Sequence, residues 1–248
     1  MEKSTLIFGI RAVIEAINAG KEPDKIMLQN GLSGELFSEL RKILQGTKIP
    51  FQFVPSEKLN RITSKNHQGV IAFLSEIQYY DVEDIIPVIF EEGQTPLILI
   101  LDRITDVRNF GAIARTAECS GVHAIVIPSR GAAQVNGDAV KTSAGALHKI
   151  KVCRSNNLKD TLDYLKESGL QIISCTEKTD QFLYAVDFTA PSAIIMGSEE
   201  DGISGEYLKR SDHKVKIPMP GTIESLNVSV ATGVILYEAV RQRIANSE

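Results

Sequence analysis

Three stretches of the sequence place polar side chains directly after short apolar runs. The first stretch carries Asn109 and Arg115, and the second carries Glu199. The third carries Ser225 and Asn227. A few amide, carboxylate, hydroxyl and guanidinium groups of this kind can fix the orientation of a polar ligand. Because open α/β sheets bind ligands beyond the carboxyl ends of their strands, the sequence predicts that the three stretches share one ligand site.

Each stretch taken alone also fits a plainer interpretation. Asn109 could cap an amphipathic helix whose first turns carry Gly111 and a surface Arg115. Gly197 would allow a close backbone approach, but Glu199 could equally belong to an acidic surface turn. The sequence contains neither GxxxxGKS/T nor GxGxxG, so an ordinary P-loop or Rossmann nucleotide site is not expected.

The elements that must position these residues follow a repeated strand and helix pattern. Continuous apolar runs, typical of a parallel sheet covered on both faces, occupy 97–101, 124–127, 171–174, 193–196 and 215–217. Helical spacing lies between them, at 109–120, 137–146, 158–168 and 205–209. The fold class predicted for residues 96–248 is therefore α/β, with an open, doubly wound parallel sheet.

The N-terminal third has a pattern of its own. Helices are predicted at 9–18, 34–44 and 56–62, and strands at KIMLQN, 51–54 and 69–74. This alternation predicts a small α/β domain over residues 1–75. The segment 76–95 is acidic, contains Pro87 and Gly93, and fits neither neighbouring pattern, so we predict it to be a linker.

The overall charge argues against binding nucleic acid by bulk attraction. The 248 residues carry a formal net charge of −4 and a pI near 5.7. Two segments are nevertheless basic, one with Lys58, Arg61, Lys65 and His67 and the other with Lys141, His148, Lys149, Lys151 and Arg154. Each could be a local RNA-binding site or simply solvated surface charge.

Several classes of protein are not expected. No run approaches the roughly 18 apolar residues of a membrane helix, and the N-terminus lacks the features of a signal peptide. The three cysteines are widely spaced and form no CxxC pair, so neither a disulfide framework nor a zinc site is expected. We therefore expect a cytoplasmic protein with no metal and no membrane association.

The C-terminal segment 216–243 predicts a Pro/Gly loop followed by a long helix. Apolar residues cover more than one face of the predicted helix over 226–243, which exceeds what a single sheet face can bury. A second subunit is the simplest cover for the remaining face.

The ordered set NFGAIARTAECSG, IIMGSEEDGIS and IPMPGTIESLNVSVATGVILYEAVRQR resembles the three motifs of the SpoU/TrmH class of SPOUT methyltransferases. The resemblance covers residues 97–243. The preceding unit resembles that family's N-terminal substrate-binding domain, with FGIRAVIEA and KNHQGVIAF at its two ends. The two-domain arrangement is similar to members that methylate a guanosine of 23S ribosomal RNA.

This resemblance implies a deep trefoil knot in the C-terminal domain, S-adenosylmethionine as the cofactor, and a homodimer formed through the C-terminal helix. The reaction it implies is transfer of a methyl group to a ribose 2′-hydroxyl of RNA, without a metal. The implied catalytic residues are Arg115, Glu199 and Asn227, supported by Asn109 and Ser225. The implied cofactor-binding residues are Gly197, Ile217, Met219 and Leu226.

The resemblance suggests how the catalytic residues divide the work. Arg115 would grip the phosphate beside the target ribose, because an arginine with a pKa above about 12 is a poor base. Asn227 and Ser225 would orient the ribose, and Glu199 would hold Arg115 or backbone NH groups in place. Lys58, Arg61, Lys65 and His67 would contact RNA. A tRNA 2′-O-methyltransferase, a noncatalytic RNA-binding protein and a metabolite-binding domain stay open as alternatives.

Overall fold

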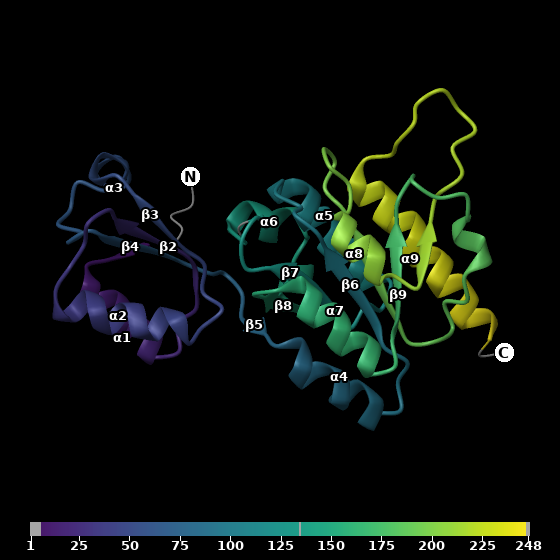
Figure 1. Ribbon diagram of the computed structural model, residues 1–248, viewed down its shortest axis with the longest axis horizontal. Helices are drawn as coiled ribbons and strands as arrows, with labels where there is room; N and C mark the ends of the chain where they lie inside the picture. The colour runs from purple at the N-terminus through teal and green to yellow at the C-terminus, as the bar shows by residue number, and fades with distance from the viewer. Residues whose placement is uncertain (1–5, 134, 247–248) are drawn as a thin grey trace. The chain divides into compact units, whose positions relative to one another are not determined.

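The computed structural model describes residues 6–133 and 135–246, which form two compact units (Figure 1). Within the described residues, the first unit comprises 6–78 together with the short segment 135–137, and the second comprises 79–133 and 138–246. The α/β fold class predicted from the sequence is confirmed in both units. Among the described helices, none is long and apolar enough to cross a membrane.

The first unit is a four-stranded sheet with helices on both faces. Its elements are β1 (Leu6–Phe8), α1 (Ile10–Asn18), β2 (Pro23–Gln29), α2 (Glu35–Gln45), β3 (Phe51–Val54), α3 (Ser56–Ile62) and β4 (Val70–Leu74). The strand order is β1-β4-β2-β3, in which only β2 and β3 pair in parallel. Ile26 and Leu28 of β2 pack with α1 and α2, whereas Met27 between them packs with Leu59 of α3. The alternation of side chains along β2 therefore gives this unit two small cores.

The second unit is built on a seven-stranded parallel sheet of order β11-β9-β10-β6-β7-β8-β5. Its strands are β5 (Tyr79–Tyr80), β6 (Leu97–Leu101), β7 (Ala124–Pro128), β8 (Lys151–Ser155), β9 (Gln171–Cys175), β10 (Ser192–Met196) and β11 (His213–Val215). Its helices are α4 (Val82–Glu91), α5 (Val107–Cys119), α6 (Gly137–Thr142), α7 (Leu158–Glu167), α8 (Gly205–Arg210) and α9 (Val228–Ala245), with short 3-10 turns at Ala146–His148 and Leu183–Ala185.

Helices cover both faces of this sheet, which explains why its strands are continuously apolar. Ile98 and Ile100 of β6 pack in one core with residues of α4, α7 and α8. Leu97, Leu99 and Leu101 alternate with them and point to the opposite face, the side on which α5 and α9 pack against each other. This second layer brings the first and third sequence motifs together.

The segment 76–95, which the sequence predicts to be a linker, contains β5 and α4. Val82, Ile85, Ile86 and Ile89 of α4 are buried in the core of the second unit. These four residues have helical spacing, but Pro87 lies inside the helix, and a residue with no NH and a fixed φ argues against a helix when only the sequence is read. The element was hidden in the sequence by this proline and by neighbouring acidic residues.

The second basic segment is not a uniform surface patch. Strand β8, which the sequence did not predict, includes Lys151 and Arg154. Arg154 is buried, with its guanidinium carbon 3.4 Å from the centre of the Tyr79 ring. The arginine packs on the edge strand β5 instead of facing solvent, so the interpretation of 141–154 as a single basic surface is wrong for Arg154.

Candidate functional site

The start of α9 is the centre of the candidate site. Asn227 caps the helix, because its Oδ1 accepts hydrogen bonds from the Ser229 backbone NH at 3.0 Å and the Ser229 hydroxyl at 2.6 Å. Helix α9 begins at Val228, slightly later than predicted, so Ser225 and Leu226 belong to the loop that precedes it. The cap uses the amide oxygen and leaves the amide nitrogen directed away from the helix.

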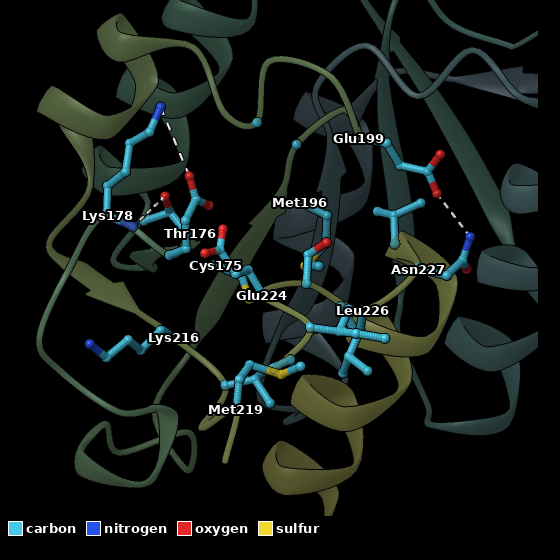
Figure 2. A pocket seen from close by; sticks show the side chains of 18 of the residues that line it. Cys175, Thr176, Lys178, Met196, Glu199, Lys216, Met219, Glu224, Leu226 and Asn227 are labelled. Carbon is cyan, nitrogen blue, oxygen red and sulfur yellow. Dashed lines mark hydrogen bonds and ion pairs between the residues drawn. The ribbon is translucent and has the colours of Figure 1, made fainter. Parts of the chain in front are cut away.

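That nitrogen completes a polar cluster drawn from all three motifs. Asn227 Nδ2 donates to Glu199 Oε1 at 2.8 Å (Figure 2). It also donates to Asn109 Oδ1 at 3.1 Å. Asn109 Nδ2 donates to the same Glu199 oxygen at 3.1 Å. Residues separated by 118 positions in the chain therefore share one hydrogen-bonded triangle. The carboxylate of Glu199 accepts hydrogen bonds from two neutral amides, which add no positive charge beside it.

Asn109 does not cap α5, contrary to one interpretation of the sequence. The cap is Asp106, whose Oδ1 accepts from the Asn109 backbone NH at 2.7 Å. Asn109 therefore lies in the first turn of α5 and its side chain is available for the cluster. The neighbouring Gly111 is required by packing, because an added Cβ would lie 2.7 Å from the Ala139 carbonyl oxygen of α6.

A cavity of about 1300 Å³ opens beside the cluster. Glu199, Asn227 and Ser225 line it, as do all four residues predicted to bind the cofactor: Gly197, Ile217, Met219 and Leu226. Figure 2 shows Met219 and Leu226 beside the cavity and Glu199 with Asn227 at one end. Apolar walls next to a carboxylate suit the flat adenine ring and the positively charged sulfur of S-adenosylmethionine, while polar groups of the lining can meet its ribose and amino-acid parts.

Gly197 is needed at the bend where β10 meets the cavity. A Cβ at this position would lie 2.2 Å from the Gly202 carbonyl carbon and 2.4 Å from the Ile203 nitrogen. No side chain fits there, so the backbone of 197–202 folds back tightly on itself. Glu199 is carried on this turn.

Arg115 lies apart from the other candidates in this chain. It is exposed on α5, six positions after Asn109, so its side chain leaves the helix roughly 120° away from that of Asn109. It is not among the residues that line the cavity. Within the described parts of the chain, Glu199 contacts Asn109 and Asn227 and not Arg115.

The far end of the cavity was not predicted from the sequence. Thr176 and Lys178, in the loop after β9, line the end opposite Glu199 (Figure 2). The rule that ligands bind beyond strand ends would have included them, because the run QIIS was already predicted as a strand. Burial raises the pKa of the neighbouring Cys175 thiol to about 12, so at neutral pH it is protonated and a poor nucleophile.

The candidate RNA-binding residues of the first unit divide into two kinds. Lys58 and Arg61 of α3 and the following Lys65 are exposed. His67 is buried, its Nδ1 accepts from the Gly69 NH at 3.0 Å, and its Nε2 lies 2.9 Å from Asn60 Oδ1. An Nδ1 acceptor leaves Nε2 as the donor, so both ring nitrogens have internal roles and His67 does not present an RNA contact.

Lys25 is a further cation near this surface that the sequence analysis missed. Partial burial lowers the pKa of Lys25, and the positive charge of Lys58 lowers it further. The second effect places the two lysines within electrostatic range of each other.

As for metals, no group of His, Cys, Asp or Glu side chains in 6–133 and 135–246 is arranged to hold an ion.

Two family descriptions match the chain, one for each unit. The SpoU rRNA Methylase family matches residues 96–237, and the domain described as RNA 2′-O ribose methyltransferase substrate binding matches residues 6–80. The 23S rRNA (guanosine-2′-O-)-methyltransferase of Yersinia pestis is 34% identical over 244 residues, covering 97% of this chain and 98% of the relative.

Two further matches cover nearly the whole chain. YacO of Bacillus subtilis (strain 168), assigned to the TrmH family of tRNA/rRNA methyltransferases, is 34% identical over 238 residues, covering 96% of this chain and 95% of the relative. The SpoU methyltransferase AviRb from Streptomyces viridochromogenes, solved in complex with the cofactor AdoMet, matches with a TM-score of 0.62 and 27% identity, covering 97% of this chain and 90% of that one. The chain therefore belongs to the SpoU rRNA methylase family.

Proposed function

We propose that this protein transfers a methyl group from S-adenosylmethionine to the 2′-hydroxyl of a guanosine in 23S ribosomal RNA, in the cytoplasm. Membership of the SpoU family makes it an S-adenosylmethionine-dependent RNA 2′-O-methyltransferase. The finer substrate is supported by relatives named 23S rRNA (guanosine-2′-O-)-methyltransferase that align over almost the whole chain. The single observation that carries the proposal for the site is the triangle of Asn109, Glu199 and Asn227 at the edge of the cavity.

The proposed chemistry follows from the donors and acceptors of this triangle. The cofactor, when bound, supplies an electrophilic methyl group on a positively charged sulfur. Both amides contact Oε1 of Glu199, so within the described residues Oε2 is available to accept a hydrogen bond from a ribose hydroxyl. We assign Glu199 and the two asparagines to holding the 2′-hydroxyl, and Ser225 to the ribose contact beside it. Proton removal is then left to phosphate or water.

Arg115 has a separate role in this proposal. An arginine guanidinium in general can bind a phosphate and stabilise developing negative charge, but it is a poor base. Its exposed position on α5, away from the triangle, is compatible with meeting the RNA backbone instead of the cofactor.

We also propose that residues 1–75 select the RNA, while residues 96–248 hold the cofactor in a knotted domain. The match of residues 6–80 to an RNA 2′-O ribose methyltransferase substrate-binding domain supports this division. The exposed cations Lys58, Arg61 and Lys65 are the proposed phosphate contacts.

The proposed assembly is a homodimer through α9. Its support is an apolar face of α9 that is exposed in the single chain and consists of Val230, Val234, Tyr237 and Ile244. Leu236, by contrast, is fully buried. Val234→Asp should therefore give a folded monomer in sedimentation, whereas Leu236→Asp should fail to fold because it buries a charge. A folded Val234→Asp dimer would contradict this interface.

Ribose methylation mapped in ribosomal and transfer RNA tests the substrate. A strain lacking this protein should lose one 2′-O-methylguanosine of 23S ribosomal RNA, and the wild-type chain should restore it. Complementation with Asn227→Ala should not restore it. Loss of a tRNA methylation instead would support the alternative substrate, and restoration by Asn227→Ala would show that the proposed site is wrong.

A further inference from the structure

Arg103, directly after β6, is held in a backbone conformation that arginine seldom adopts. Its φ is +59°, in the left-handed region where side chains other than glycine are disfavoured. The preceding Asp102 is only 1% exposed, and its backbone NH donates to the Met196 carbonyl at the end of β10. Such a conformation persists only where surrounding contacts impose it, and these contacts lead toward the candidate site.

The Arg103 guanidinium joins the end of β6 to the turn that carries Glu199. Its Nε donates to Asp102 Oδ1 at 2.9 Å. Its two terminal nitrogens donate to the turn that follows the neighbouring strand β10. One donates to Asp201 Oδ2 at 2.9 Å and the other to the Gly202 carbonyl at 3.2 Å. One planar, rigid group therefore fixes a strand end and a distant loop at the same time, which a flexible ammonium group could not do.

The turn itself is closed and attached at both sides. The Gly202 NH donates to the Ser198 carbonyl at 3.0 Å, and the Asp201 NH donates to the Ser198 hydroxyl at 3.2 Å. Beyond the turn, the Ser204 NH donates to Asp102 Oδ2 at 2.7 Å. Glu199 lies between Ser198 and this closing contact, so its position depends on where Asp201 and Gly202 are held.

We infer that Arg103 is a positioning residue for methyl transfer, because it holds the 197–204 turn so that Glu199 meets Asn109 and Asn227. The inference rests on the proposed role of Glu199. The guanidinium does not itself reach the triangle, so it acts through the turn. A displacement of about 1 Å in a group that orients a reactant can lower the rate by on the order of 100-fold.

A purely stabilising ion pair is the competing explanation, and two substitutions at the same residue separate the two. Arg103→Gly and Arg103→Met both remove the guanidinium, but glycine also relieves the left-handed backbone. Arg103→Gly should therefore melt at a higher temperature than Arg103→Met. If Arg103 positions Glu199, both variants should lose kcat equally, by roughly 10- to 100-fold.

Arg210→Met is the matched control. Arg210 pairs with Asp163 through a 3.1 Å contact elsewhere in the same unit, and its side chain is 33% exposed, against 38% for Arg103. The control should keep its kcat. Hydrogen exchange of the Asp201 and Gly202 amides gives a readout independent of activity, because both should exchange faster in the two Arg103 variants and not in the control.

The outcomes distinguish the inference from the site on which it depends. Glu199→Gln should lose kcat at least as strongly as the Arg103 variants, while affinity for S-adenosylhomocysteine falls much less in all three. Full activity of Glu199→Gln would overturn the proposed site. A loss in Glu199→Gln together with normal kcat in Arg103→Gly, or with kcat that follows melting temperature, would overturn the role of Arg103 alone.

Discussion

The two sets of candidate residues in this protein are organised in opposite ways. In the first unit, the cations Lys58, Arg61 and Lys65 lie within eight positions of one another and are separately exposed. In the second unit, Asn109, Glu199 and Asn227 come from distant parts of the chain and hydrogen bond to one another. In the proposed function, the first set supplies separate charges to the phosphates of an RNA chain, whereas the second set holds a single ribose oxygen in one fixed arrangement.

This difference predicts how each set responds to substitution. Independent phosphate contacts contribute in roughly equal, salt-dependent steps. Members of a hydrogen-bonded cluster act as a unit, so losing one of them misplaces the others. Binding of RNA and turnover should therefore fail separately.

The largest expected effect is on the cluster. Asn227→Ala removes two donated hydrogen bonds and should lower kcat by about 100-fold or more, while RNA affinity and its salt dependence stay unchanged. Asn246→Ala, at the other end of α9, is the control and should have normal turnover. The comparison fails if Asn227→Ala instead weakens RNA binding with kcat intact.

The next largest loss of kcat is expected for a substitution of Arg115. Arg115→Ala should lower kcat by about 100-fold while affinity for S-adenosylhomocysteine, measured by calorimetry, is nearly unchanged. Arg108 lies on the same face of α5 two turns earlier and is also exposed, so Arg108→Ala is the matched control. Equal effects of the two substitutions would mean that Arg115 is only a surface charge.

The basic set of the first unit should respond in affinity and not in turnover. Replacing Lys58, Arg61 and Lys65 together by glutamine should weaken RNA binding and flatten its salt dependence, by roughly 0.7 to 0.9 in logarithmic slope for each phosphate that is no longer neutralised. At saturating RNA, kcat should be retained. Glutamine at Lys21, Arg41 and Lys42, three exposed cations elsewhere in the unit, removes the same charge and should leave the slope nearly unchanged.

The smallest expected effect is at His67. His67→Gln should lower the melting temperature, because the ring connects Asn60 to the Gly69 backbone, yet it should leave the salt slope of RNA binding as it is. A flatter slope in this variant would return His67 to the RNA-binding set and remove the distinction between the two kinds of residue.

Most of the parallel sheet could be predicted, because strands that are covered on both faces consist of continuous apolar runs such as LILIL and AIIM. Strand β8 was missed because Arg154 is buried by stacking on Tyr79, a contact that no local pattern encodes. Helix α4 was missed because Pro87 within it argued against a helix, although its apolar residues have helical spacing. Tertiary packing therefore overrides the local pattern in β8, whereas in α4 it follows an apolar pattern that was present in the sequence.

The site could be predicted only as residue types. The motifs identified Asn109, Glu199 and Asn227, but not that the two amides would share one carboxylate oxygen. The role of Asp106 as the cap of α5 frees Asn109, and the burial of His67 removes it from the basic surface. Each of these facts depends on where neighbouring elements lie in space. The spacing of residues along the chain does not give that information.

The double role of Asn227 makes the protein vulnerable to a chemical change that leaves its shape intact. Asn227→Asp, the result of spontaneous loss of the amide, would keep the oxygen that caps α9. It would also replace the donor that faces Glu199 with a second carboxylate oxygen, so two like charges would meet where a hydrogen bond had been. An aged preparation could therefore melt normally and still be inactive, and the added negative charge and small gain in mass of the peptide that contains Asn227 would reveal the cause.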